Sequence, residues 1–247
     1  MIWALIFAFL VAILGGSPVL LPNMDKLAKE HIEDKDRKDD MLLLIKEAQK
    51  QRKAFAKKDK KISKEMNKVF ALRESSHQDF TIQIDKWIES REEMQAVNQK
   101  LFYESQNLVT EQEWRNMKPD FKEGIEKLDK QATKKRKKVD KAFIKTESKF
   151  KKTIEDDEKS QKAIQTLNAF KVSIDNTMNG YSEQMLDENS IVYEYTIEKQ
   201  QIIDIQDKHT KILNEALSGY TDLHFTLVDV TTEKEWKKLQ SKLKLPF

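Results

Sequence analysis

Apolar residues in the charged part of this chain recur in alternating steps of three and four, the spacing of a helix that buries one narrow stripe. The first stripe lies between residues 25 and 74, a region without Gly or Pro. Polar Arg52 and Asp59 take two of its steps, where they are expected to fix register at some cost in stability. The pattern predicts one long helix. Its apolar positions are Met41, Ile45, Ala48, Phe55, Ile62, Met66 and Val69.

A second stripe with the same spacing begins after Ser75 and Ser76, whose side chains favour the N-cap of a helix. Only a few residues separate the two stripes, so their helices are expected to pack as an antiparallel hairpin. The second stripe comprises Phe80, Ile84, Trp87, Arg91, Met94, Asn98, Leu101, Ser105 and Leu108.

Two further helices are predicted after Pro119 and Gly124 interrupt the pattern. A third helix is expected over residues 125–178, ended by Asn179-Gly180, because Gly tolerates the left-handed conformation that follows a helix. Its stripe is Val139, Phe143, Thr146, Phe150, Ile164, Leu167, Ile174 and Met178. A fourth helix carries Val192, Tyr195, Ile202, Ile205, His209, Ile212 and Ala216. Beyond Gly219, the β-branched run at 225–230 leaves a frayed helix and an extended segment as alternatives.

The two halves share a phrase and a charge pattern. Thr-Glu-X-Glu-Trp occurs at 110–114 and again at 232–236, and matching Phe80 to Tyr195 upstream requires an insertion of one heptad in the second half. Residues 49–68 hold nine basic and two acidic side chains, and residues 130–152 hold eleven and two. The helix that follows each is acidic. These features predict a duplicated hairpin, with one module at 23–118 and another at 119–247.

The shared phrase has a physical role at the start of a helix. Thr110 and Thr232 are expected to cap it, while Glu113 and Glu235, three residues later, reach back to the cap amide. Trp114 and Trp236 are then expected to pin a short terminal helix across the seam of each hairpin.

The first 22 residues contain no charged side chain and, as a helix, span about 33 Å, enough for a bilayer core of about 30 Å. A cleaved signal peptide is the alternative, but the basic region that begins such peptides is missing. We therefore expect residues 1–22 to be a single-pass membrane anchor. The bases that follow it, including Lys26 and Arg37, favour a cytoplasmic soluble region under the positive-inside rule.

The composition and motifs of the chain give little indication of catalysis or of metal or cofactor binding. The chain has no Cys, its four His form no metal-binding pair, and no phosphate-binding loop or nucleophile motif occurs. We expect no enzyme activity, no cofactor and no metal site. One basic run could contact phospholipid or nucleic acid, although a face that is solvated or paired with the acidic helix is the favoured interpretation and nucleic acid is not expected as a partner. It comprises Lys134, Lys135, Arg136, Lys137 and Lys138.

A charged helical hairpin ending in this phrase resembles small periplasmic helical proteins of the CpxP/Spy-like and heavy-metal-resistance class, in which a Leu-Thr-X-X-Gln phrase caps a helix. The segment 108–113 is similar to that phrase at Thr110, with Glu113 in place of Gln. The resemblance implies a helical adaptor or chaperone facing the cell envelope, on the opposite side from the positive-inside prediction.

Together these patterns predict an all-α protein: an N-terminal transmembrane helix followed by two long, antiparallel, coiled-coil-like hairpins. We expect a membrane-anchored, non-enzymatic interaction or scaffold protein that engages a protein partner or a second copy of itself through its helix seams. An envelope-stress holdase or adaptor is the alternative. A binder of membrane surfaces or nucleic acid through residues 130–152 ranks third.

Overall fold

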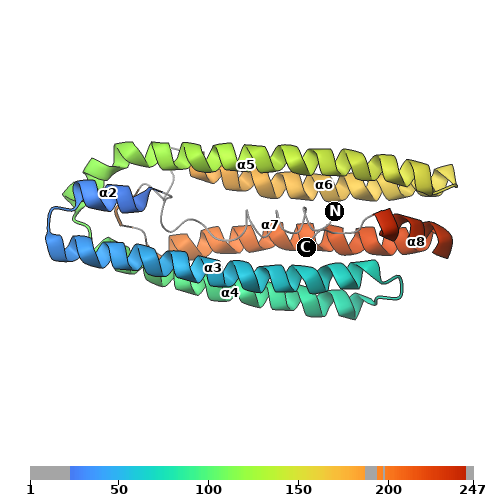
Figure 1. Ribbon diagram of the computed structural model, residues 1–247, viewed down its shortest axis with the longest axis horizontal. Helices are drawn as coiled ribbons and strands as arrows, with labels where there is room; N and C mark the ends of the chain where they lie inside the picture. Colours follow the sequence, from blue (N-terminus) through green and yellow to red (C-terminus); the bar gives the residue numbers. More distant parts are fainter. Residues whose placement is uncertain (1–22, 187–193, 197, 243–247) are drawn as a thin grey trace.

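The computed structural model describes residues 23–186, 194–196 and 198–242, and this part of the chain is all-helical. The longer helices lie roughly parallel to one another (Figure 1). In chain order the helices are α2 (Met24–His31), α3 (Lys35–Ala71), α4 (His77–Asn107), α5 (Glu111–Thr153), α6 (Asp157–Leu186), α7 (Lys199–Val230) and α8 (Glu233–Lys242).

Helices α3 and α4 form an antiparallel hairpin joined by residues 72–76. The Asp34 carboxylate accepts a hydrogen bond from the Arg37 amide at the start of α3. Ser76 and Asp79 form a reciprocal capping box at the start of α4. Most of the predicted stripe positions are buried, including the polar pair Asp59 and Arg91. Periodicity therefore identified the seam of this hairpin.

The predicted third helix is wrong in its extent, because the chain breaks it at residues 154–156. Helix α5 ends with Ile154 in an extended conformation, and the Asp156 carboxylate then accepts the Lys159 amide to start α6. Neither Gly nor Pro marks this break, which is why the pattern of apolar residues concealed it. The predicted stripe is buried throughout, but α5 and α6 share it.

Two residues expected to stop helices lie inside them. Pro119 is within α5, and Gly180 is within α6, so the predicted stop at Asn179-Gly180 is wrong. Pro removes one amide donor, and here the helix continues past it. The segment after Gly219, left open by the sequence, is helical to Val230. A Cβ at Gly219 would lie 3.1 Å from Phe170 Cδ2, so the glycine permits the close approach of α6 and α7.

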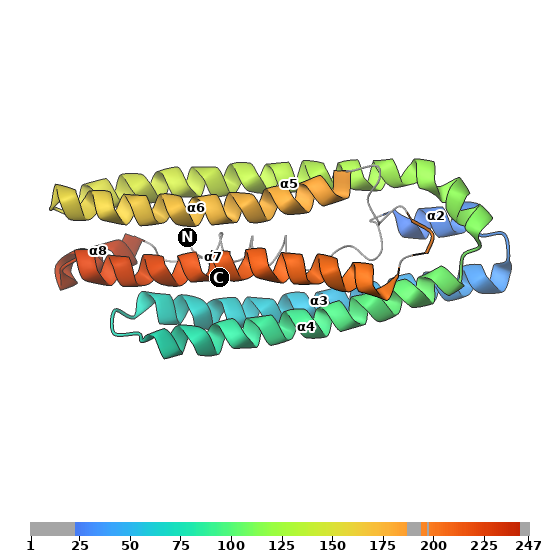
Figure 2. The ribbon, with the colours of Figure 1, turned by 180° about the vertical axis from the view of Figure 1, so that it is seen from behind.

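Helices α6 and α7 pack antiparallel as a second hairpin, and the two hairpins lie side by side through α4 and α7 (Figures 1 and 2). Helix α5 packs on α6, α2 packs between α3 and α5, and α8 packs on the end of α5. Helices α3 and α5 lie on the side nearest the viewer in Figure 1, whereas α4 and α6 are nearest in Figure 2. The outer faces of α3 and α5 therefore point to the same side of the molecule.

Two hydrophobic cores hold this arrangement. The smaller joins α2, the start of α3, the end of α4 and the start of α5, and includes Leu27, Met41 and Phe121. The larger joins α6, α7, α8 and the end of α5 to the tip of the α3/α4 hairpin, and includes Phe70, Phe170 and Trp236. The tip of the first hairpin is thus part of the core of the second.

Within the described residues, no helix combines the length and apolar character needed to cross a membrane. Residues 1–22, which the sequence predicts as the anchor, lie outside the described part of the chain.

Candidate functional site

The first shared phrase forms a corner where three segments meet. Thr110 and Glu113 make a capping box, with the Thr110 amide 2.8 Å from Glu113 Oε2 and the Glu113 amide 3.2 Å from Thr110 Oγ1. The Glu33 amide, 80 positions away in sequence, donates to Glu113 Oε1 at 3.0 Å. Arg37 donates to both carboxylate oxygens, at 2.6 and 3.0 Å, and to the Leu108 carbonyl at 3.1 Å. The cap of α5 therefore also ties down the start of α3.

The electrostatics of this corner favour ionised Glu113. Hydrogen bonding to the Arg37 guanidinium lowers the pKa of Glu113 to about 2, although burial acts in the opposite direction. The same interaction raises the pKa of Arg37. The corner is a structural charge clamp whose carboxylate is already saturated with donors.

The second phrase forms a matching corner. The Thr232 amide donates to Glu235 Oε2 at 2.7 Å, the Glu235 amide to Thr232 Oγ1 at 3.3 Å, and the Glu155 amide to Glu235 Oε1 at 2.7 Å. Burial raises the pKa of Glu235, but hydrogen bonds from the Thr232 and Glu155 amides outweigh it and the pKa is lowered. No described arginine takes the place of Arg37 at this corner.

The two corners are part of a repeat in which equivalent residues of the two halves are separated by a constant number of positions. The N-cap residues Asp34, Ser76 and Thr110 have counterparts at Asp156, Glu198 and Thr232, each 122 residues later. Buried positions follow the same offset without a gap, in the pairs Met41 and Ala163, Met94 and Ala216, Leu101 and Leu223, and Met117 and Leu239.

This register corrects the alignment made from sequence. The counterpart of Phe80 is Ile202 rather than Tyr195, and no inserted heptad is needed. Equivalent positions run from 24 to 117 and from 146 to 239, so the start of α5 belongs to the first set and its end to the second. The expected boundary between residues 118 and 119 falls inside this continuous helix.

The two tryptophans hold equivalent backbone positions but have different neighbours. Trp114 is half-buried and lies edge-on to Phe121 at 4.8 Å between ring centroids. Trp236 is buried, its indole Nε1 donates to the Ala71 carbonyl at 3.3 Å, and the Arg73 guanidinium lies 5.7 Å from its ring centroid. Trp236 therefore fastens α8 to the tip of the first hairpin.

A buried histidine lies at the same junction, and no pattern in the sequence indicated its role. The His224 ring is fully buried among aromatic side chains, with centroids 4.8 Å from Phe80 and 5.2 Å from Phe70. Its Nδ1 lies 3.1 Å from the Phe70 carbonyl, so a neutral ring can donate a hydrogen bond there. Burial lowers the pKa of His224 to about 4. The residue is neutral at physiological pH and holds α7 against the tip.

The seam of the first hairpin contains a buried ion pair. Arg91 Nη2 lies 2.5 Å from Asp59 Oδ2, and the guanidinium lies over the Trp87 ring at 4.6 Å from the centroid. Burial raises the pKa of Asp59, while Arg91 opposes the shift. Both side chains are less than a tenth exposed, so a substrate dissolved in the solvent cannot reach them. The pair joins α3 to α4 across the seam, and its role in fixing their register stays a prediction.

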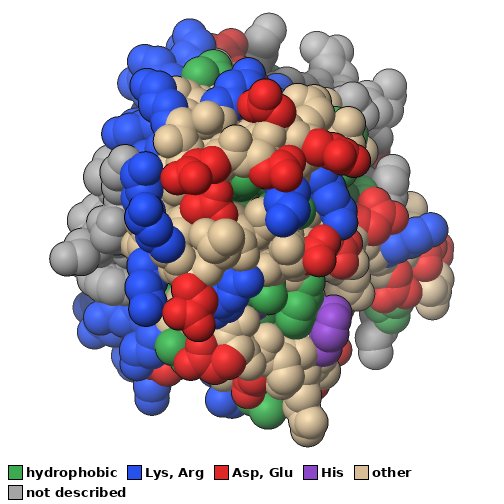
Figure 3. Space-filling model, turned by 90° about the vertical axis from the view of Figure 1, so that its right-hand side faces the viewer, with side chains coloured by type: hydrophobic (Ala, Val, Ile, Leu, Met, Phe, Trp, Pro, Cys, Tyr) green, Lys and Arg blue, Asp and Glu red, His purple; other side chains and the backbone are tan. Residues whose placement is uncertain are grey.

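The outer faces of α3 and α5 are strongly basic. The predicted run at 134–138 lies on α5, where Lys134, Lys137 and Lys138 are exposed and Arg136 donates to the Asn179 side chain. Figure 3, an end view, shows Lys and Arg side chains along the edge that faces the viewer in Figure 1. We define the basic face as nine exposed lysines on these two helices: Lys53, Lys57, Lys60, Lys61, Lys134, Lys137, Lys138, Lys141 and Lys145.

These nine lysines make no ion pair with any described residue, and the interhelical ion pairs of α3 and α5 involve other lysines. Lys58 pairs with Glu93 of α4, and Lys171 of α6 pairs with Asp140 of α5. The described acids of the partner helices therefore do not pair with these lysines, which leaves the solvated face as the applicable half of the favoured interpretation.

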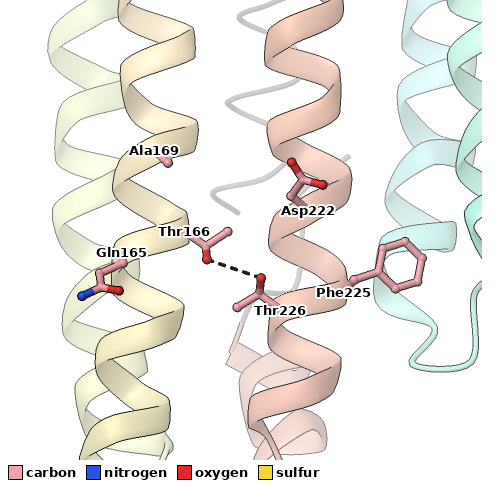
Figure 4. A pocket seen from close by; sticks show the side chains of 6 residues that line it. All are labelled: Gln165, Thr166, Ala169, Asp222, Phe225 and Thr226. Carbon is pink, nitrogen blue, oxygen red and sulfur yellow. Dashed lines mark hydrogen bonds between the residues drawn. The ribbon is translucent and has the colours of Figure 1, made fainter.

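An open depression lies between α6 and α7 on another side of the bundle (Figure 4). It is lined by Gln165, Thr166, Ala169, Asp222, Phe225 and Thr226. Thr166 Oγ1 donates to Thr226 Oγ1 at 3.3 Å, and the Phe225 ring stacks on His77 with centroids 3.7 Å apart. Its lining offers hydroxyl and amide groups and a single carboxylate, without a nucleophile paired to a base.

One group of side chains has the composition of a metal site. Ligand atoms of Glu30, His31 and Asp120 lie within 4.8 Å of one another. The ammonium of Lys26 lies 4.0 Å from the Glu30 carboxylate, and His31 Nε2 lies 3.1 Å from Asp120. The contacts between His31 and Asp120 and between Lys26 and Glu123, the latter at 4.0 Å, dock α2 on α5, whereas Lys26 and Glu30 pair within α2.

A comparison of the chain with protein-family models, curated proteins and solved structures finds no match.

Proposed function

We propose that this chain is a membrane-anchored, non-enzymatic helical interaction or scaffold protein whose working surface is the basic face. The proposal rests on the concentration of exposed lysines on the outer faces of α3 and α5 that form no ion pair with a described acid. A patch of one charge sign raises the local concentration of oppositely charged partners and speeds their association.

We propose a working surface outside the helix seams. Side chains of the chain itself fill the seams between α3 and α4 and between α6 and α7. A partner or second copy would have to separate buried residues such as Trp87 and Phe170 to enter them. We therefore assign recognition to the outer faces.

The holdase alternative lacks support from the described surface. Chaperones that bind unfolded clients use contiguous apolar patches. The large exposed apolar side chains here lie on different segments, with one each on α3, the α3–α4 turn, α4, α5 and α6: Leu43, Leu72, Ile82, Ile144 and Val172.

Anchoring is tested with reporter fusions after Pro22 and after Phe247, combined with alkaline carbonate extraction of membranes. The proposal predicts that the full chain stays with the bilayer after extraction and that both reporters assign one side to the soluble region. Release of the full chain into the supernatant would overturn the anchored function. Cytoplasmic reporters would remove the envelope-chaperone alternative.

A further inference from the structure

We propose that the basic face binds anionic phospholipid headgroups, so that the bundle lies along the membrane surface beside its own anchor. This inference rests on the proposed function, since it uses the anchor at residues 1–22. It adds the chemical class of the partner and the orientation of the bundle.

The lysines of α5 lie on the side of the helix opposite its core. Lys134, Lys138, Lys141 and Lys145 recur every three or four residues, out of phase with the buried positions Val139, Phe143, Thr146 and Phe150. They extend over about 17 Å of helix. Such a row presents charge along a line parallel to the helix axis.

Helix α3 supplies a second row. Lys53, Lys57, Lys60 and Lys61 are exposed and lie away from the buried Asp59 and Ile62, which face α4. Helices α3 and α5 lie on the same side of the bundle (Figures 1 and 2), so both rows of lysines are on that side. A partner with a flat surface can contact the lysine rows of α3 and α5 at the same time.

The charge on this surface is poorly compensated. The acids of α3 within residues 49–68 are Asp59, which is buried against Arg91, and Glu65, which pairs with Lys68. Those of α5 within 130–152 are Asp140 and Glu147, which pair with Lys171 and Lys151. Each lysine near an anionic bilayer strengthens binding about five-fold, and the effect fades beyond a Debye length of about 8 Å.

The position of the anchor favours lipid over a nucleic acid. Only Asn23 separates the apolar segment 1–22 from α2, and α2 packs against α3 and α5, so the tether leaves the bilayer beside both basic helices. Residues 49–68 and 130–152 together hold eighteen lysines and two arginines, Arg52 and Arg136. Single-stranded nucleic acids are typically bound with stacking aromatics, and bases are read by planar arginines, whereas lysine acts as a point charge.

The test uses the full chain in vesicles and one fluorescent probe at a time. The protein has no Cys, so Ser148→Cys places a unique label on the basic side of α5 and Gln165→Cys places a control label on α6. Vesicles contain phosphatidylcholine alone or with about 30% phosphatidylglycerol, plus a lipid that carries a nitroxide at its headgroup.

We expect the nitroxide to quench the Ser148→Cys probe strongly in anionic vesicles and weakly in neutral ones, and about 0.5 M salt to reverse the difference. The Gln165→Cys probe should respond equally in both lipids. Equal quenching of the Ser148→Cys probe in neutral and anionic vesicles would overturn the inference. So would release of quenching by a DNA duplex at a stoichiometric dose, since that result assigns the face to nucleic acid.

Matched charge variants separate the basic face from net charge. Lys134→Gln, Lys137→Gln and Lys141→Gln together should weaken docking about 100-fold, so that more phosphatidylglycerol is needed for half-maximal quenching. The control replaces three exposed lysines elsewhere, Lys86, Lys100 and Lys211, and should not shift this midpoint. Equal shifts in both variants would refute a localised face.

Failure of the inference differs from failure of the proposed function. If the anchor is absent, the chain leaves the vesicles on carbonate extraction whatever the probe reports. If the chain remains in the bilayer but the Ser148→Cys probe is not quenched, only the lipid-binding face is wrong.

Discussion

The Glu113 corner offers the sharpest stability prediction, because one carboxylate ties the start of α5 to Glu33 and to Arg37 of α3. Glu113→Gln keeps the size of the side chain but removes its charge and one of its acceptor oxygens. The pKa of Glu113 falls from an ordinary 4.5 to about 2, which corresponds to about 3 kcal/mol at neutral pH. Since Arg37 is 30% exposed, solvent screening reduces the expected loss to about 2 kcal/mol.

The pH dependence follows from the direction of this shift. The folded-state pKa of Glu113 is depressed, so its contribution is fully present above about pH 4.5 and disappears as the pH falls toward 2. Urea unfolding of the full chain in detergent, followed by tryptophan fluorescence, measures the difference between wild type and Glu113→Gln. That difference should be about 2 kcal/mol at pH 7 and close to zero near pH 2.

Two matched variants control this experiment. Glu111→Gln removes an exposed carboxylate from the same helical turn and should cost less than about 0.5 kcal/mol. Glu235→Gln affects the second corner, which lacks a described arginine, and should cost about 1 kcal/mol. If Glu113→Gln costs no more than Glu111→Gln, or if its cost persists undiminished near pH 2, the clamp reasoning is wrong.

Further predictions concern buried ionisable groups. Because the pKa of His224 is lowered to about 4 in the folded state, stability should fall by up to about 3 kcal/mol as the pH drops from about 6.5 to 4. His224→Phe should flatten this part of the urea-midpoint profile, and an unchanged slope would contradict the assignment. Arg91→Leu should cost about 3–5 kcal/mol because it leaves Asp59 buried without its partner. Adding Asp59→Leu should recover most of that loss in thermal unfolding, and a double variant as unstable as the single one would refute this.

Local periodicity made the seams predictable. Residues such as Phe80, Trp87 and Met94 recur at helical spacing, and all three are buried. Thr110 and Glu113 were predictable as a capping box for a similar reason, because the interaction spans only three residues. Structural features could be predicted from the sequence where they depend on residues that are close together in the chain.

The tertiary features were not predictable in the same way. The third partner of Glu113 is the amide of Glu33, 80 residues away, and any residue type could supply it. His224 is surrounded by aromatics from α3, α4 and α8, and its own helical neighbours do not reveal that environment.

The helix break at Asp156 and the 122-residue register had signals that were missed. Ile-Glu-Asp occurs at 32–34 and at 154–156, once before α3 and once before α6. The first copy follows a short helix, whereas the second interrupts an apolar stripe that continues on both sides. The continuous stripe therefore hid a repeated N-cap.

We propose that the basic face of α3 and α5 is the working surface of this protein. Photo-crosslinking in native membranes tests it most directly, with benzophenone attached at Ser148→Cys or, as the control, at Gln165→Cys. We expect several-fold more crosslinked lipid or partner from the Ser148→Cys position, and we expect the triple α5 lysine variant to abolish the difference. Equal yields from the two positions, or a higher yield from α6, would contradict it.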